Sequence, residues 1–232
     1  MIKNLLIIIA LVGMVIITIP LVREYQTPKV ISGVAQDYVE LSASKLNIPN
    51  TITAIVVTFR GLDTLGEVTV LFLATAGVGF LLKSKNTKKT KKRAGSEILK
   101  TGSAILTPMI LVLGVYIFTH GHLTPGGGFQ GGVVIASAFL LQIMAHEDFK
   151  FSHHLIHFTE SISGFSYVMI GLAGLVILGF NHFLDPRWLE LGKWGSLFSA
   201  GAVPIIYSLV GIKVGAEMSS LLNSLKEDGG DE

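Results

Sequence analysis

The chain has 232 residues, of which 50% are hydrophobic and only 15% are charged, and its mean hydropathy is +0.62. Soluble domains carry about a quarter charged residues, so this composition excludes an ordinary soluble protein. The chain has no cysteine, which excludes disulfides, thiolate nucleophiles, iron–sulfur ligation and cysteine-zinc sites within it. We therefore expect any redox cofactor to lie on a partner subunit.

Long apolar segments predict an all-α, polytopic membrane protein with about six transmembrane helices, since roughly 18 apolar residues suffice to cross a bilayer. The first segment could be mistaken for a secretory signal. It ends in Pro20 and "LVREY" rather than in a small-residue cleavage site, so we interpret it as a retained helix. The predicted spans cover residues 4–21, 64–82, 98–119, 128–146, 161–180 and 194–215.

The segment 83–93, "KSKNTKKTKKR", holds seven of the eighteen basic residues and no acidic one. Cytoplasmic loops of membrane proteins are enriched in Lys and Arg, so we predict that this loop is cytoplasmic and touches membrane lipids. Six spans then place both termini in the cytoplasm of a multi-pass protein of the cell membrane. A nucleic-acid partner is disfavoured, because no aromatic residue interleaves with the lysines to stack on bases.

The basic segment also predicts the domain organisation. A two-span N-terminal unit (1–82) precedes a basic cytoplasmic linker (83–94), a four-span unit (95–220) and an acidic tail (221–232). Before the second span, "NIPNTITAIVVTFRG" contains an apolar run too short to cross a bilayer. We expect it to lie at the membrane interface as an amphipathic piece.

The stretch "FRGLDTLGEVTVLFLA" concentrates charge beside an apolar run. Arg60, Asp63 and Glu67 follow a spacing of three and four residues, which places them on one face of a helix that begins before Arg60. Two interpretations remain open. Asp63 could cap the helix and pair with Arg60, or Glu67 could be a protonatable or cation-binding carboxylate, since ionisable groups within spans are costly.

Other charged residues lie close to predicted span ends. Lys100 follows Glu97 by three residues, and Lys213 precedes Glu217 by four, so we interpret both as surface pairs at the membrane boundary. Glu160, within "TES", is expected to cap its helix. The histidines of "HEDFKFSHHLIH" do not provide the three or four converging ligands of a zinc site, so no metal is predicted, and contacts with headgroups or a partner subunit are expected.

The stretch "HGHLTPGGGFQGG", residues 120–132, separates two apolar runs. It lacks the Gly-Lys-Ser/Thr ending of a Walker loop and the strand–helix context of a dinucleotide fingerprint. Glycines permit positive φ and close backbone approach, and non-helical backbone at membrane depth survives only when buried in protein or beside a water-filled cavity. We predict a re-entrant bend shaped by Pro125, with Phe129 as an apolar plug or packing anchor and His120 or His122 able to exchange protons near neutral pH.

Two longer motifs resemble a known family. "GHLTPGGGFQGGVVIASAFLLQ", residues 121–142, is similar to the signature of the B subunit of Mrp-type multisubunit Na+/H+ antiporters. It also resembles the equivalent subunit of archaeal membrane-bound hydrogenases and their sulfur-reducing relatives. "VVTFRGLDTLGEVTVLFLATAGVGFLL", residues 56–82, resembles the C-terminal end of the antiporter A subunit or a small separate protein, MbhE-like, that precedes the B-like unit.

The resemblance implies a membrane subunit of a Mrp-like antiporter module that contributes to sodium and proton translocation. The module would stand alone or belong to a hydrogenase- or sulfane-reductase-type respiratory complex, whose subunits would be its partners and would hold any redox cofactor. Because the large A-type body is missing here, most of the translocating machinery must come from partners. No catalytic site is expected in this chain, and the alternative is a structural scaffold subunit that carries no ion.

The resemblance also assigns residues. Glu67 would carry the proton or the sodium ion, and Asp63 and Arg60 would support its position and charge. His122 and Lys100 are further candidates for ion translocation. The loop motif either shapes a subunit contact or lines an ion passage, and it comprises Gly121, Pro125, Gly126, Gly127, Gly128, Phe129, Gly131 and Gly132.

Overall fold

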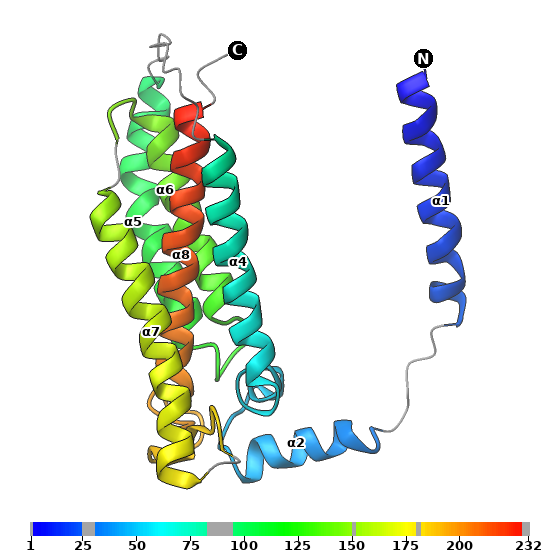
Figure 1. Cartoon of the computed structure of the whole chain (residues 1–232), viewed down its shortest axis with the longest axis vertical. Helices are drawn as coiled ribbons and strands as arrows, with labels where there is room; N and C mark the ends of the chain where they lie inside the picture. The colour runs from blue at the N-terminus through cyan, green and yellow to red at the C-terminus, as the bar shows by residue number, and fades with distance from the viewer. Residues whose placement is uncertain (1, 25–30, 83–94, 150–151, 180–181, 229–232) are drawn as a thin grey trace. The chain divides into compact units, whose positions relative to one another are not determined.

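The fold is described from a computed structural model, shown in Figure 1. The structure describes residues 2–24, 31–82, 95–149, 152–179 and 182–228. The chain divides into two compact units, residues 1–37 and 38–232. The basic segment 83–93, with the topology inferred from it, and the end of the acidic tail lie outside the described residues.

The described residues are helical wherever they form regular structure, which confirms the all-α prediction. In the first unit, α1 covers Ile2–Glu24, with a shorter apolar stretch over Asn4–Pro20. Five further helices are long and apolar enough to cross a membrane, consistent with about six spans. They are α4 (Gly61–Leu82), α5 (Glu97–Thr119), α6 (Gly128–Ala145), α7 (His153–Leu178) and α8 (Val203–Asp228).

Three predicted spans match α4, α5 and α6 to within about three residues, but the last two start elsewhere. The helix α7 begins eight residues before the predicted 161. The helix α8 begins nine residues after the predicted 194, because the chain between them turns repeatedly. Positive φ angles occur there at Gly195 (76°), Ala200 (67°) and Gly201 (59°), and a right-handed helix cannot continue through them.

The helix α8 is the centre of the second unit. It packs against α4, α5, α6 and α7, and half of its apolar window is buried, against 6% for α4. Figure 1 shows α8, in red, running alongside these helices. Its buried face contributes Val203, Ile206, Tyr207, Val210 and Val214 to the hydrophobic core. A helix this enclosed has few positions left that face lipid.

The short segment before α4 is helical, as α3 (Thr51–Thr53) and a π-helical turn, η1 (Ala54–Phe59). It is too short to cross a membrane, as predicted. One side of it, with Thr53, Ala54 and Val57, is completely buried in the core of the bundle, whereas Ile52 is 71% exposed. Its position at the membrane interface stays a prediction. Ahead of it, α2 covers Val34–Ser44.

Candidate functional site

The residues singled out in "FRGLDTLGE" lie at the start of α4. Arg60 Nη2 lies 2.5 Å from Asp63 Oδ2, which confirms the predicted ion pair. Their side chains are 62% and 51% exposed, so water or a partner can reach both. The helix begins at Gly61, and Asp63 stands in its first turn rather than at the cap.

Glu67 is the seventh residue of α4 and is exposed on the surface of this unit. Val70, three residues further along the helix, is 66% exposed. Asp63, one turn before Glu67, is also exposed and pairs with Arg60. Glu67 is therefore an exposed carboxylate between a surface ion pair and an apolar stretch of α4.

Lys100 lies in the first turn of α5, where its Nζ is 3.2 Å from Glu97 Oε1. The lysine side chain is 39% exposed and the glutamate side chain 89% exposed. This is the surface pair that the sequence predicts. Ser96 caps the same turn by accepting a hydrogen bond from Leu99 N–H.

The glycine loop between α5 and α6 needs glycines because of its backbone conformation. Gly126 and Gly127 both have a φ of 152°, a conformation that side-chain-bearing residues rarely adopt. Two residues that the sequence analysis missed hold this loop. Asn50 Nδ2 donates to the carbonyl oxygens of Gly121 and Thr124, and Thr53 Oγ1 donates to that of Gly121 at 2.6 Å.

The remaining glycines of the motif set the distances between helices. A Cβ at Gly128 would lie 2.6 Å from the Tyr207 carbonyl oxygen, and one at Gly132 would lie 2.7 Å from that of Gly211. A Cβ at Gly131 would lie 2.7 Å from the Gly114 carbonyl oxygen on the opposite side of α6. These contacts let α6 approach both α5 and α8 closely, as small residues do in membrane bundles.

His122 is completely buried within this loop. Its Nε2 lies 3.3 Å from the Ser196 carbonyl oxygen and must donate to it, which leaves Nδ1 as a buried acceptor without a described hydrogen-bond donor. Burial lowers the pKa of His122, the contact with Ser196 only partly offsets this effect, and the nearby His120 lowers it further. The burial therefore favours the neutral imidazole, and a role of His122 in ion translocation stays a prediction.

Two other residues of the motif face outward. Phe129 is 39% exposed and Pro125 is exposed, so neither is enclosed by the described residues. The role of Phe129 as an apolar plug or packing anchor stays a prediction. Within the described residues the ring of Tyr207 lies against Gly121 and Gly127.

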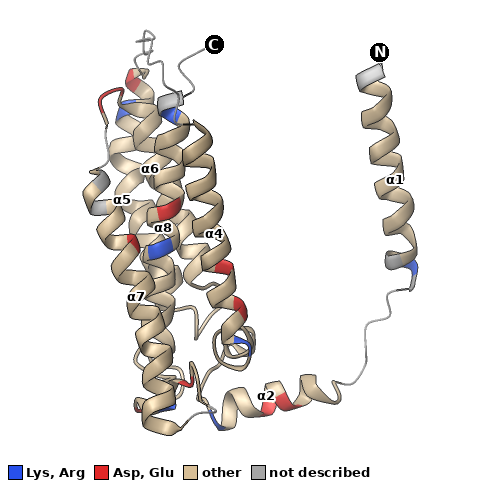
Figure 2. Ribbon diagram, viewed as in Figure 1, with Lys and Arg blue, Asp and Glu red and all other residues tan. Residues whose placement is uncertain are grey.

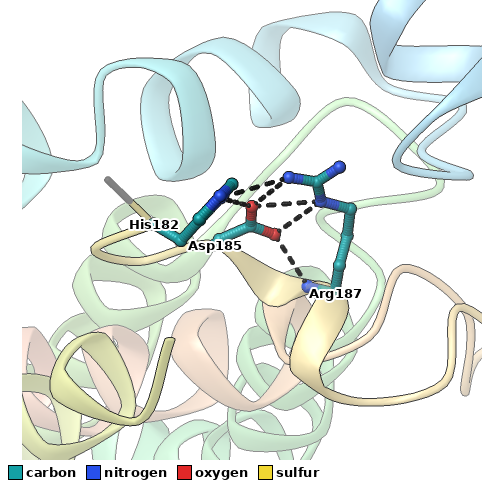
Figure 3. A network of polar contacts seen from close by, with 3 residues as sticks. All are labelled: His182, Asp185 and Arg187. Carbon is teal, nitrogen blue, oxygen red and sulfur yellow. Dashed lines mark hydrogen bonds and ion pairs between the residues drawn. The ribbon is translucent and has the colours of Figure 1, made fainter. Parts of the chain in front are cut away.

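A compact polar network lies between α7 and α8, at η2 (Pro186–Trp188), and is drawn in Figure 3. Arg187 Nε lies 2.9 and 3.0 Å from the two carboxylate oxygens of Asp185, and His182 Nδ1 lies 2.9 Å from Oδ2. Burial opposes ionisation of Asp185, but these hydrogen bonds hold its pKa below its ordinary value. With Lys45 the three residues line a cavity of about 260 Å³, which is open to solvent on one side.

The pair formed by Lys213 and Glu217 is not at the membrane boundary, which corrects the prediction. Lys213 Nζ lies 2.6 Å from Glu217 Oε1, and the two side chains are 11% and 0% exposed. Because α8 begins at Val203, both residues stand near its middle. Figure 2 shows a blue, basic stretch of α8 next to a red, acidic one there. Glu160 is likewise two turns inside α7 and 9% exposed, rather than at its cap.

Comparison with known proteins identifies both parts of the chain. Residues 98–220 match the family model described as "Domain related to MnhB subunit of Na+/H+ antiporter", and residues 2–91 match the model of MbhE, a family of MBH subunits. The protein MJ1307 of Methanocaldococcus jannaschii is 31% identical over 201 residues, covering 75% of each chain. A Staphylococcus saprophyticus protein described as antiporter subunit mnhB2 is 48% identical over 50 residues, 22% of this chain and 36% of the relative.

Two solved structures share the fold. A chain of the membrane-bound sulfane sulfur reductase, an archaeal respiratory membrane complex, is 42% identical with a TM-score of 0.82, covering 97% of this chain and 98% of the other. A chain of the Mrp complex from Dietzia sp. DQ12-45-1b is 22% identical with a TM-score of 0.72, covering 97% of this chain and 26% of the other. That second similarity concerns the fold alone. The chain belongs to the family of multi-pass membrane proteins related to the MnhB subunit of Na+/H+ antiporters, preceded by a region of the MbhE family.

Proposed function

We propose that the chain is a membrane subunit of a Mrp-type Na+/H+ antiporter module in which Glu67 carries a proton or a sodium ion. The module stands alone or works within a membrane-bound respiratory complex related to sulfane sulfur reductases or hydrogenases. Family membership and the similarity to a chain of a respiratory complex support this assignment. Sodium ions and protons are the cargo, and any redox cofactor resides on partner subunits.

The observation that carries the proposal is the placement of Glu67. This carboxylate belongs to a helix long enough to cross the membrane, and it is exposed on the surface of the second unit, one turn from Asp63. Ionisable groups within membrane helices are costly and are by default candidates for ion pathways. In the proposed module a partner subunit covers Glu67, and the ion site is completed between chains.

The chemistry follows from a single carboxylate. When Glu67 releases its proton, the negative charge creates a site for a monovalent cation, and a bound sodium ion in turn disfavours reprotonation. The ion pair of Arg60 and Asp63 lies one turn away and is neutral overall, with both partners solvent-accessible. It sets the local field around Glu67 without competing for the cation.

A scaffold function without ion transport is the second candidate. It is favoured by the glycine contacts of α6, which serve close packing between helices. A scaffold tolerates the loss of the Glu67 charge, whereas an ion carrier does not.

Gentle purification of the complex through a tag on this chain, followed by mass spectrometry, tests the assignment to a module. Recovery of large antiporter-like subunits supports it. Additional subunits that bind nickel or iron–sulfur clusters identify a respiratory complex, and their absence indicates a stand-alone exchanger. Recovery of this chain alone in high yield, in a mild detergent, contradicts the proposal.

A further inference from the structure

We propose that Glu160, Glu217 and Lys213 form a proton-binding site inside the bundle, separate from Glu67 and loaded through His157. The site goes beyond the proposed function, because it does not require Glu67 to carry an ion. It rests on three features of α7 and α8: an excess of one carboxylate, a carboxylate oxygen without a hydrogen bond, and an ordered gradient of exposure.

The charges of the buried cluster do not balance. Lys213 and Glu217 form an ion pair with side chains 11% and 0% exposed, while the side chain of Glu160 on α7 is 11% exposed. Glu160 lies on α7, which packs against α8, and its charge acts on Glu217. With all three residues ionised the cluster would carry one net negative charge in a low-dielectric interior, which is costly. One added proton neutralises it.

The cluster has a place for that proton. Oε1 of Glu217 accepts from Lys213 Nζ at 2.6 Å, whereas Oε2 has no hydrogen-bond partner among the described atoms. A buried carboxylate oxygen without a donor is unfavourable, whereas a protonated carboxyl group can itself donate. Two carboxylates in one site commonly share a single proton for this reason.

The other elements packed against the cluster contribute little charge. From α4 the Phe72 ring lies 5.2 Å from Lys213 Nζ, which favours the cationic form of the lysine. Gly164 of α7 lies beside the lysine side chain, where a Cβ would make an ordinary contact with Nζ at 3.6 Å. The helix α6 has no ionisable residue. The charged residues of α4 and α5 stand in the first two turns of these helices: Asp63 and Glu67 on α4, and Glu97 and Lys100 on α5.

His157 provides a route for protons from solvent to the buried cluster. Its Nδ1 lies 3.5 Å from Glu160 Oε2, and its side chain is 70% exposed, so exposure falls from His157 to Glu160 to Glu217. An imidazole gains and loses a proton near neutral pH. In the proposed step, His157 accepts a proton from solvent at Nε2 and gives the proton at Nδ1 to Glu160, which becomes a neutral carboxyl group. The imidazole returns to its neutral form, and the proton is then shared between Glu160 and Glu217.

Infrared difference spectroscopy of the purified complex between alkaline and acidic pH tests the site directly. We expect the carbonyl band of a protonated, buried carboxylic acid to appear on acidification and to be lost in Glu160→Gln and in Glu217→Gln. The control is Glu97→Gln, which alters a lysine-paired but exposed glutamate and should keep the band. His157→Gln should slow the appearance of the band after a pH jump without changing its final height.

If Glu217→Gln fails to assemble, the charge-neutral double variant Lys213→Met/Glu217→Gln takes its place, and Glu160→Gln is measured in either case. A difference spectrum that is the same in wild type, Glu160→Gln and the double variant overturns the proposal. The readout is protonation rather than transport. Glu67→Gln should therefore leave the band intact even where it abolishes antiport, so the two proposals can fail independently.

Discussion

Lys213 Nζ and Glu217 Oε1 lie 2.6 Å apart, one turn from each other on the most enclosed helix of the bundle. The two opposite charges stabilise each other in an interior where no water can solvate them. Removing Lys213 would leave the buried carboxylates of Glu217 and Glu160 without their cation, and an uncompensated buried charge typically costs about 3–5 kcal/mol.

Lys213→Met is therefore expected to destabilise the protein strongly, as measured by thermal unfolding in detergent. Lys213→Met/Glu217→Gln should recover part of the loss, because it also removes the carboxylate that the lysine pairs with. The matched control is Lys100→Met, which breaks an exposed pair worth about 1 kcal/mol or less. Equal melting temperatures for the Lys213→Met and Lys100→Met variants would show that the buried pair is not essential to the fold.

The packing of α6 on α8 gives a second prediction. A Cβ at Gly132 would lie 2.7 Å from both the Gly211 carbonyl oxygen and the Val214 Cβ, so Gly132→Ala must push the helices apart. Overpacking of this kind costs about 1–3 kcal/mol.

The control is Gly102→Ala on α5, where a Cβ would meet nothing within 4 Å. This substitution should be neutral or slightly stabilising, because alanine favours a helix by about 1 kcal/mol over glycine. Thermal unfolding and the yield of monodisperse protein measure both variants. The packing account fails if Gly132→Ala is as well tolerated as Gly102→Ala.

The burial of His122 predicts a dependence of stability on pH. Because its pKa in the folded protein is lower than the ordinary value of 6.5, the unfolded chain binds more protons than the folded one below that pH. The stabilisation is fully present above pH 6.5 and is lost as the pH falls from there toward the lowered value.

His122→Gln should reduce the loss of stability on acidification, measured as the melting temperature across this range. His154→Gln provides the control, since His154 is exposed and does not act on His122. A pH profile that is the same in wild type and His122→Gln would mean that protonation of this histidine does not oppose folding.

The sequence predicted the apolar helices because the length of an apolar run is a local property. The glycine loop was also foreseeable, since the φ of Gly126 and Gly127 and the contacts of Gly128 and Gly132 exclude larger residues. Its anchoring by Asn50 was not, because that contact joins residues 71 positions apart. An asparagine and several threonines within a short apolar segment were the only available signal.

The misreading of Lys213 and Glu217 has a specific physical origin. A helix starting at residue 194 would place the pair near its end, within reach of the headgroups. The turns at Gly195 and Gly201 delay the start of α8 to Val203, and this shift carries the pair into the middle of the bundle. Mean hydropathy over a sequence window does not detect such turns. The predicted start of α8 was therefore too early, and the buried pair was interpreted as a surface pair.

The most direct test of the account is sodium-dependent proton movement in liposomes that contain the purified complex. We predict that Glu67→Gln lowers the rate by about tenfold or more, since glutamine can neither release a proton nor attract a cation as a carboxylate does. Glu97→Gln should leave the rate unchanged, and subunit composition must be the same in both preparations. Normal exchange by an intact Glu67→Gln complex would contradict the account and favour the scaffold.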